Sequence, residues 1–384
     1  MSDRMPVTLA CGGDASLGRG IADGIRRQGA GWVFELLAPA VASADLMTFN
    51  WESPVLPAGQ DPPEKGLVVP EELVAGVTDA LPPLAVTIGN NHVLDAGVAG
   101  IPATRRRLDE LGVAHFGAGE TEEEGRALRV VEVKGLRIGF LGRAEDCPQL
   151  SGRCAPGPAL IRMPQLIEDV RAGAERCDCL VVHLHQGVEF VDWPGPHFVR
   201  LCRELTRAGA RLVIGNHPHV PQGHERHAAG HIFYSLGDLV FDVANSDYLS
   251  QGSPWTSRSV VALVPVGPDN VGEPTLLPHR IDTAGRPIPL DGAEATEVLD
   301  HVAAISADLG DAAAMQRHWR DTALRYLGIN IRWAKDGLDE NGLPTEEMLR
   351  SFFSRLALDE NRAWVRELFG DAEWVRNIHR PPWT

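Results

Sequence analysis

The sequence predicts an α/β protein with a helical extension at its C-terminal end, and three observations support this. Short apolar runs recur from residue 7 to about residue 240, and segments with the spacing of amphipathic helices lie between them. Polar side chains able to bind a metal follow these runs repeatedly, at the position where open α/β sheets bind ligands. From about residue 293 the pattern is almost entirely helical.

The predicted strands are short apolar runs bounded by polar or glycine-rich turns. Lys134-Gly135 is expected to form the hairpin turn between two of them. After Asp242, two further runs have the pattern of strands that complete a sheet. The ten predicted strands cover residues 7–10, 46–49, 85–88, 128–133, 136–141, 180–183, 212–214, 232–234, 257–265 and 276–281.

Helices are predicted between the strands and throughout the extension. Apolar residues between 198 and 205 recur at the spacing of one buried helix face, and this helix leads to Gly209. A second helix is expected to end near Gly112, as a C-cap glycine predicts. In the extension, two segments keep one apolar face, formed by Val298, Val302, Ile305 and Leu309 and by Leu349, Phe352, Phe353 and Leu356.

Composition and charge exclude some classes of partner. The 384 residues carry a formal net charge of −16, which opposes binding to nucleic acid or to anionic lipid. No stretch approaches the roughly 18 apolar residues that a membrane-spanning helix needs. The first seven residues lack the apolar core of a signal peptide, and the six cysteines have no disulfide or ligand spacing. We therefore expect a cytoplasmic protein without membrane or nucleic-acid partners.

The first three predicted strands are each followed by groups that could bind a metal. Asp14 follows the first strand, although a simple Gly-Asp turn would also explain it. Glu52 follows the second strand and offers a hard carboxylate ligand. Asn90-Asn91-His92 follows the third, and two amides before a histidine are unusual outside functional sites. Asp95 lies where it could orient His92.

The later strands supply nitrogen ligands. His183 and His185 end one strand, and period-two alternation places both on the same face. We expect His183 to be a core histidine, which leaves His185 as the ligand. His217 and His219 follow another strand in the order Gly-x-His-Pro-His, the strongest single signal in the chain.

Together these residues predict a metal centre. Six mixed oxygen and nitrogen ligands are too many for one tetrahedral zinc and fit two divalent ions, of Mn, Fe or Zn. His92 is predicted to donate a proton to the leaving group, with Asp95 orienting it. Arg19 and Arg143 each follow a strand and could bind a phosphate or carboxylate, although a surface salt bridge would explain either equally well. The predicted metal ligands are Asp14, Glu52, Asn91, His185, His217 and His219.

The order of these motifs resembles the CapA family of poly-γ-glutamate capsule biosynthesis proteins, a branch of the calcineurin-like metallophosphoesterase superfamily. The resemblance covers roughly residues 7 to 242. It rests on Gly13-Asp14 with Leu17-Gly18-Arg19, Asn50-x-Glu52, Asn90-Asn91-His92-x-x-Asp95, His185-x-Gly187-x-Glu189, Gly215-x-His217-Pro218-His219 and Tyr234-Ser235-Leu236-Gly237.

The resemblance implies a four-layer α-β-β-α sandwich with the metals at the loop ends of the two sheets. It assigns the first aspartate of the superfamily to Asp14 and the bridging carboxylate to Glu52. We further expect Asn50 and Asn90, with Arg19 and Arg143, to bind the substrate. Three positions depart from the expected pattern, with Ser16 in place of a histidine, Gln186 in place of a tryptophan and Asp238 in place of an asparagine. The first departure leaves both one-metal and two-metal sites open.

The function predicted from the sequence is that of a metal-dependent hydrolase. A metal-activated hydroxide would attack a phosphoester or a γ-glutamyl or peptide-type amide in a small anionic substrate. The alternatives are a non-catalytic binding or assembly component of polyglutamate, capsule or peptide biosynthesis, and an amide-forming enzyme on the same fold. We expect residues 1–290 to form the domain and residues 291–384 a helical extension packed on it, as a lid or as part of a homodimer.

Overall fold

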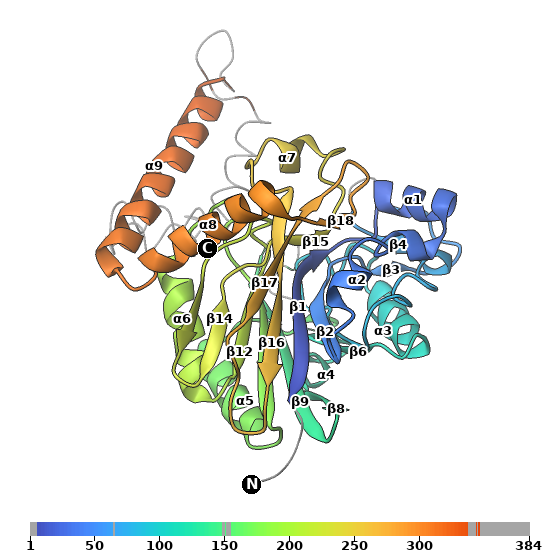
Figure 1. Ribbon diagram of the computed structural model, residues 1–384. Coiled ribbons are helices and arrows are strands. Elements are labelled where there is room, and N and C mark those ends of the chain that lie inside the picture. The colour runs from blue at the N-terminus through green and yellow to red at the C-terminus, as the bar shows by residue number, and fades with distance from the viewer. Residues whose placement is uncertain are drawn as a thin grey trace, which may run out of the picture.

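Two β-sheets face each other, and helices cover the outer face of each sheet (Figure 1). The computed structural model describes residues 6–63, 66–147, 150, 155–336, 343 and 345, with the backbone alone for residues 326–336. The first sheet has the path β18-β17-β16-β1-β2-β5-β6, and β15 also pairs with β1. Its strands are β18 (Pro287–Pro289), β17 (Thr275–Ile281), β16 (Arg258–Val266), β1 (Val7–Ala15), β2 (Leu46–Trp51), β5 (Leu84–Thr87), β6 (Ala114–Phe116) and β15 (Asp238–Val240).

The second sheet has six strands in the order β13-β14-β12-β11-β9-β8. Two short ribbons, β3 with β4 and β7 with β10, lie outside both sheets. The sheet consists of β13 (His224–His227), β14 (Gly230–Phe233), β12 (Leu212–Asn216), β11 (Cys179–His185), β9 (Leu136–Ala144) and β8 (Arg129–Val133), and the ribbons of β3 (Val55–Leu56), β4 (Val69–Pro70), β7 (Ala118–Gly119) and β10 (Gly157–Pro158).

Three apolar layers hold the sandwich together. Leu9, Phe140 and Val181 belong to the central layer between the two sheets, and each is completely buried. One outer layer lies between the first sheet and its helices, and the other between the second sheet and α5 and α6. The helices are α1 (Gly20–Gln28), α2 (Ala38–Val41), α3 (Gly100–Glu110), α4 (Glu122–Arg126), α5 (Met163–Ala174), α6 (Pro196–Ala208), α7 (Asp247–Ser250), α8 (Gly292–Asp308) and α9 (Ala312–Asp336).

This architecture confirms the predicted α/β class and the four-layer α-β-β-α sandwich. All ten predicted strands are present, and β1, β2, β9, β11 and β12 extend two to five residues beyond their predicted ends at the edge that carries the site. The predicted helices appear as α3 and α6, and Gly112 has the positive φ of 69° that suits a residue ending a helix. The short strands β6, β13, β15 and β18 are not among the predicted ones, because three or four residues carry too little periodicity.

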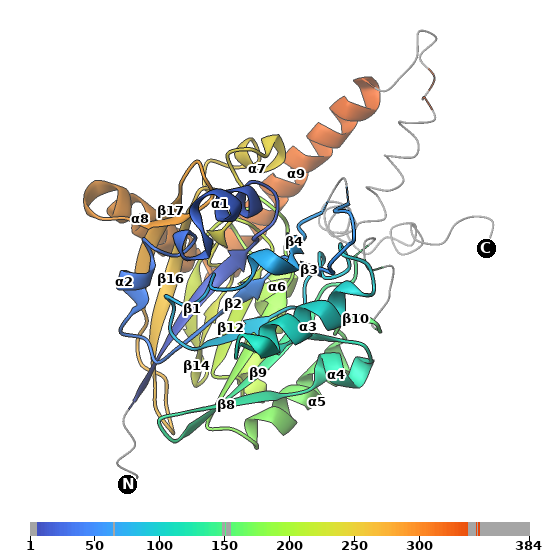
Figure 2. The same ribbon diagram turned by 90° about the vertical axis from the view of Figure 1, so that its right-hand side faces the viewer.

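The extension begins with α8, which packs on the sandwich. Val298 and Val302 contribute to the central apolar layer, and Trp319 of α9 packs against Val188 and Val191. Beyond this contact α9 projects away from the sandwich (Figure 2). The predicted apolar face from Leu349 onward lies outside the described residues, and the boundary at residue 290 stays a prediction. Among the described residues, no helix combines the length and apolar character that crossing a bilayer requires.

Candidate metal centre

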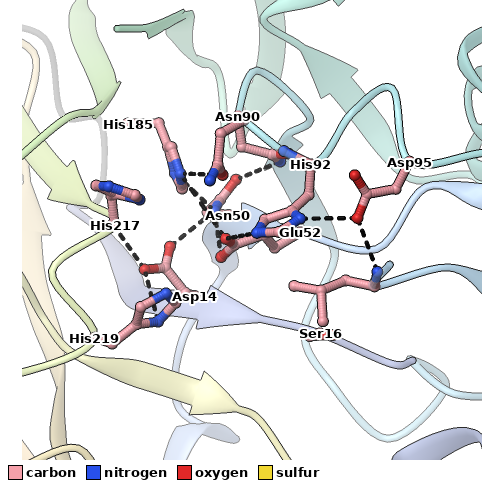
Figure 3. A network of polar contacts seen from close by, with 12 residues as sticks. Asp14, Ser16, Asn50, Glu52, Asn90, His92, Asp95, His185, His217 and His219 are labelled. Atoms are coloured by element: carbon pink, nitrogen blue, oxygen red, sulfur yellow. Dashed lines mark hydrogen bonds and ion pairs between the residues drawn. The ribbon is translucent and has the colours of Figure 1, made fainter. Parts of the chain in front are cut away.

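The carboxyl ends of β1, β2, β11 and β12 meet at one edge of the sandwich, and the predicted ligands gather there (Figure 3). β1 and β2 run parallel in the first sheet, as do β11 and β12 in the second. Because parallel strands end at the same edge, their last side chains face one another across the gap between the sheets. Asp14, Asn50, His185 and Asn216 lie at or near these strand ends.

Asp14 is held at the centre of this edge by a close approach of two backbones. Its amide donates a hydrogen bond to the Gly237 carbonyl oxygen at 3.0 Å. A Cβ atom on Gly13 would lie 1.8 Å from that same oxygen, so only glycine fits there. The Asp14 carboxylate, itself completely buried, accepts hydrogen bonds from the Asn50 amide and the His217 backbone, each at 2.8 Å.

Two asparagines arrange the carboxylates. The Asn50 side-chain amide donates to Asp14 Oδ1 at 2.8 Å and to Glu52 Oε2 at 3.2 Å. The Asn90 amide donates to Asn50 Oδ1 at 3.1 Å and to the Trp51 carbonyl at 2.9 Å. Since both asparagines are 0% exposed and their amides are already bonded, they position the ligands instead of contacting a substrate. The predicted substrate-binding role of Asn50 and Asn90 is therefore wrong.

His185 and His183 lie on the same face of β11 but have different surroundings. His183 forms hydrogen bonds with Thr48 at 2.9 Å and with Asn216 at 3.2 Å, so it is the core histidine that the sequence predicted. His185 Nε2 instead lies 2.8 Å from Asn91 Oδ1 and 3.8 Å from Glu52 Oε1. Ligand atoms roughly 3 Å apart can share one octahedral ion with bonds of about 2.1 Å. His185 and Asn91 thus lie where a common metal could bind.

His217 and His219 follow β12 in unusual backbone conformations, with φ values of 101° and 56°. Such conformations in residues other than glycine are strained and concentrate at functional sites. The His217 ring lies with its centroid 4.8 Å from that of His185. His219 Nδ1 donates to Asp238 Oδ1 at 2.8 Å and lies 4.0 Å from Asp14 Oδ2. The Gly-x-His-Pro-His motif therefore brings both imidazoles to the carboxylates.

His92 lies beside this group and is more exposed to solvent. Its Nδ1 donates to Asp95 Oδ2 at 2.8 Å, and the same carboxylate oxygen accepts the Leu67 amide at 2.9 Å. Its Nε2 lies 3.8 Å from Glu52 Oε1 and therefore faces the ligand group. The side chain of His92 is 24% exposed, whereas that of Glu52 is completely buried. This geometry agrees with Asp95 orienting His92 at the solvent side of the centre.

Burial and charge repulsion perturb the titration of the carboxylates. Burial raises the pKa of Glu52 well above its usual value, and the Asp14, Asp238 and Glu189 carboxylates raise it further. Burial also raises the pKa of Asp238, to about 6, although His219 opposes this shift. Burial lowers the pKa of His219, but the nearby carboxylates outweigh it and leave that pKa well above its usual value. The group therefore strongly favours added positive charge.

The residues present fit divalent cations. Glu52 Oε1 and Asp238 Oδ2 are buried oxygens without a hydrogen-bond partner among the described residues. Burying such carboxylate oxygens without a proton, cation or donor is costly. Three groups of side chains each offer three potential ligand atoms that lie within 4.8 Å of one another. The groups are Asp14 with Glu52 and His185, Asp14 with His219 and Asp238, and Glu189 with His217 and His219.

The structure corrects a further prediction and leaves one open. Arg143 does not face the centre, because on β9 it pairs with Leu184 and points away from the face that carries His185. It is 1% exposed, and its guanidinium donates to Asp169 Oδ2 at 2.6 Å. Its predicted substrate contact is wrong. Arg19 is exposed at the start of α1, and its role stays a prediction.

Sequence reasoning did not include Asp238 among the ligands. Asp238 lies on the short strand β15, beside Asp14 on β1. Glu189 was not included either; its Oε1 lies 3.9 Å from His219 Nε2, whereas Asp238 contacts His219 Nδ1. The available signal was an acidic residue directly after Tyr234-Ser235-Leu236-Gly237, at the position where the resemblance leads one to expect asparagine.

Comparison with known proteins gives one family and several relatives. A family model described as bacterial capsule synthesis protein PGA_cap matches residues 8–243. A capsule biosynthesis protein CapA of Bacillus anthracis is 29% identical over 269 residues, which cover 67% of this chain and 63% of that protein. A PGA biosynthesis protein CapA of Bacillus subtilis is 28% identical over 258 residues, with coverages of 66% and 65%. The match thus spans less than two thirds of both relatives.

A third relative carries a different description. It is a probable polyglutamine synthesis accessory protein of Mycobacterium tuberculosis, 29% identical over 202 residues. The match covers 48% of this chain and 51% of that protein.

Proposed function

Because this chain belongs to the PGA_cap family of bacterial capsule synthesis proteins, we propose that its buried ligand group makes it a metal-dependent hydrolase. The bond cleaved is a phosphoester or a γ-glutamyl or peptide-type amide. The observation that carries the proposal is the group of completely buried carboxylates at the strand ends, all of them beside imidazoles. Two of these carboxylates have an oxygen without a hydrogen-bond donor among the residues that the structure describes. A purely structural role leaves that arrangement without a physical reason.

The predicted ligands lie near one another at the strand ends. Asp14, Glu52, Asn91, His185, His217 and His219 would hold two ions of Mn, Fe or Zn. Bound ions would polarise the scissile group and acidify a water molecule, which is what two-metal hydrolases require. Asn50 and Asn90 keep Asp14 and Glu52 in place through their amide hydrogen bonds.

His92 supplies the proton that the leaving group needs. Its Nδ1 is bonded to Asp95, so Nε2, which faces the centre, is the nitrogen that would deliver a proton from the cationic ring. Asp95 is itself fixed by the Leu67 amide, which limits rotation of the imidazole. A positioned acid of this kind contributes typically 10²- to 10⁴-fold to a rate.

The substrate is a small or peptide-like anion. Arg19 is exposed beyond the end of β1 and can bind a phosphate or carboxylate with its planar guanidinium. The names of two relatives refer to capsule and PGA biosynthesis, which favours γ-glutamyl compounds among the anionic amides.

The test combines metal content with turnover in His92→Gln. We expect about two ions per chain in both wild type and variant, and turnover of γ-glutamyl-p-nitroanilide or of a phosphodiester with an alkyl leaving group that falls at least about 100-fold in the variant, because these leaving groups need a proton. His115→Gln is the matched control, because His115 pairs with Asp109 at 3.1 Å on the edge strand β6, outside the centre. Equal turnover in all three proteins would show that His92 is not the acid.

An accessory role is the second candidate, and the Mycobacterium tuberculosis relative favours it by its description. In that case the same fold binds a γ-glutamyl chain or assembles a synthetic complex without turnover. Two bound ions with no hydrolysis of any phosphoester or γ-glutamyl amide would support this candidate. Absence of bound metal in wild type, even after metal is added, would contradict the hydrolase directly.

A further inference from the structure

We propose that Asp238 is a direct ligand of the second metal ion, in a subsite completed by Asp14 and His219. The inference rests on the metal centre of the proposed function but not on its hydrolytic activity. Asp14 belongs both to the group with Glu52 and His185 and to the group with His219 and Asp238. Asp14 would then contribute to the sites of both ions.

The backbone forces Asp238 and Asp14 to be neighbours. β15 runs parallel to β1, and the two aspartates are paired in register. Adjacent strands lie about 4.8 Å apart, so two carboxylates in register on the same face must meet. The turn into β15 requires Gly237, whose φ is 76° and whose carbonyl accepts the Asp14 amide.

The Asp238 side chain has the properties expected of a metal ligand. It is 0% exposed, and one of its oxygens has no hydrogen-bond partner among the described residues. Its other oxygen lies 2.8 Å from His219 Nδ1, which in turn lies 4.0 Å from Asp14 Oδ2. Two carboxylates and one imidazole form a donor set that suits Mn²⁺, Fe²⁺ or Zn²⁺.

Ser16 cannot supply a ligand to this subsite. Its hydroxyl lies 2.9 Å from the Ser53 hydroxyl and accepts the Gly18 amide at 3.4 Å. These contacts fix the turn after β1 and leave the Asp14 subsite without a donor from that turn. Asp238 reaches the same position from the neighbouring strand.

A carboxylate can also act by holding an imidazole that binds the metal, and the two roles need separate readouts. Outer partners of this kind typically change metal affinity 10- to 100-fold without removing a coordination bond. A direct ligand, when replaced by cysteine, places a thiolate on the metal. Thiolate bonded to Co²⁺ produces a charge-transfer absorption that an outer partner does not produce.

The first measurement is metal content in Asp238→Asn, with Asp242→Asn as the matched control. Asp242 is a buried aspartate on the same segment, but it accepts the Gly20 amide at the start of α1. We expect about two ions per chain in wild type and control and about one in Asp238→Asn. Two ions in all three proteins, or a single ion in wild type, would overturn the inference. No ion in wild type would overturn the proposed function as well.

The second measurement is the absorption spectrum of Co²⁺-loaded Asp238→Cys, compared with wild type and Asp242→Cys. We expect a thiolate-to-cobalt band in Asp238→Cys alone. Circular dichroism of each variant verifies folding. A folded Asp238→Cys that binds Co²⁺ without this band would show that Asp238 only positions His219. Turnover does not enter either measurement, so failure of the ligand assignment stays distinct from failure of the hydrolase proposal.

Discussion

Two groups of charged side chains in this molecule include completely or almost completely buried members. They differ in whether other side chains of the protein neutralise the buried charge. On the outer face of the second sheet, Asp169 accepts hydrogen bonds from Arg143 at 2.6 Å and from Arg126 at 2.7 and 3.1 Å. At the strand ends, Asp14, Glu52 and Asp238 are completely buried, and within the described residues only histidines form ion pairs with them.

The difference distinguishes a structural ion pair from a binding site. The Arg143 pair is complete when the chain folds, because donor and acceptor both come from the protein. The strand-end group is incomplete, since Glu52 Oε1 and Asp238 Oδ2 have no hydrogen-bond donor within the part of the chain that the structure describes. A fold keeps such an arrangement when something else supplies the positive charge. Substitutions in the first group should therefore change stability, and substitutions in the second should change metal binding.

The largest effect is expected for Asp14→Asn. Loss of the shared carboxylate should remove bound metal and reduce turnover by at least about 1000-fold, more than the 10- to 100-fold typical of outer partners. The melting temperature of the metal-free variant should stay close to that of metal-free wild type, because the loss of one repelling charge offsets the loss of one accepted hydrogen bond. Elemental analysis and calorimetry measure both. A marked loss of stability in the metal-free variant would show that Asp14, like the Arg143–Asp169 pair, serves mainly to stabilise the fold.

Arg143→Met tests the other side of the comparison. We expect the free energy of unfolding to fall by about 1–3 kcal/mol, because the buried guanidinium and its hydrogen bond to Asp169 are lost while Arg126 still pairs with that carboxylate. Metal content should stay unchanged. Arg137→Met is the control. Arg137 pairs with Asp178 but is half exposed, so its loss should cost less than about 1 kcal/mol. Denaturant unfolding compares the two. Reduced metal content in a folded Arg143→Met would contradict the separation of the two groups.

The stability of the chelated protein should depend on pH through Asp238. Burial raises the pKa of Asp238 to about 6, so the folded state holds its proton more tightly than the unfolded state does. The stabilisation is then present below pH 4 and is lost as pH rises through about 6. Between pH 5 and 7.5, wild type should lose on the order of 1–2 kcal/mol relative to Asp238→Asn. Added Mn²⁺ should remove or reverse this loss, because wild type is expected to bind one ion more than the variant. Parallel stability curves in chelator would refute the prediction.

Arg19→Ala should give the smallest effect. Arg19 is exposed, so its loss should leave metal content and melting temperature unchanged and should raise KM by up to about tenfold. Arg27→Ala, at the exposed end of α1, serves as the control. Loss of metal in Arg19→Ala would contradict this prediction, because it would show that the Arg19 guanidinium contributes to the metal centre and not only to substrate binding.

Much of the candidate site could be predicted because its residues follow strands that local periodicity reveals. His185 was predicted from alternation along β11, and His217 and His219 from their position directly after β12. Asp238 escaped prediction because β15 has only three residues and its partner Asp14 is distant in sequence. The errors at Asn50 and Asn90 have a related origin, since a polar side chain at a strand end can face either a substrate or another ligand.

The sequence by itself determined the α/β class, the strand positions and six of the candidate ligands, because apolar periodicity and turn residues act over a few neighbouring positions. The tertiary structure decided which of these side chains meet. It turned Arg143 toward Asp169, because alternate residues of β9 face opposite sides of the sheet. It placed Asp238 beside Asp14, because strand pairing depends on the packing of whole sheets and not on any local pattern.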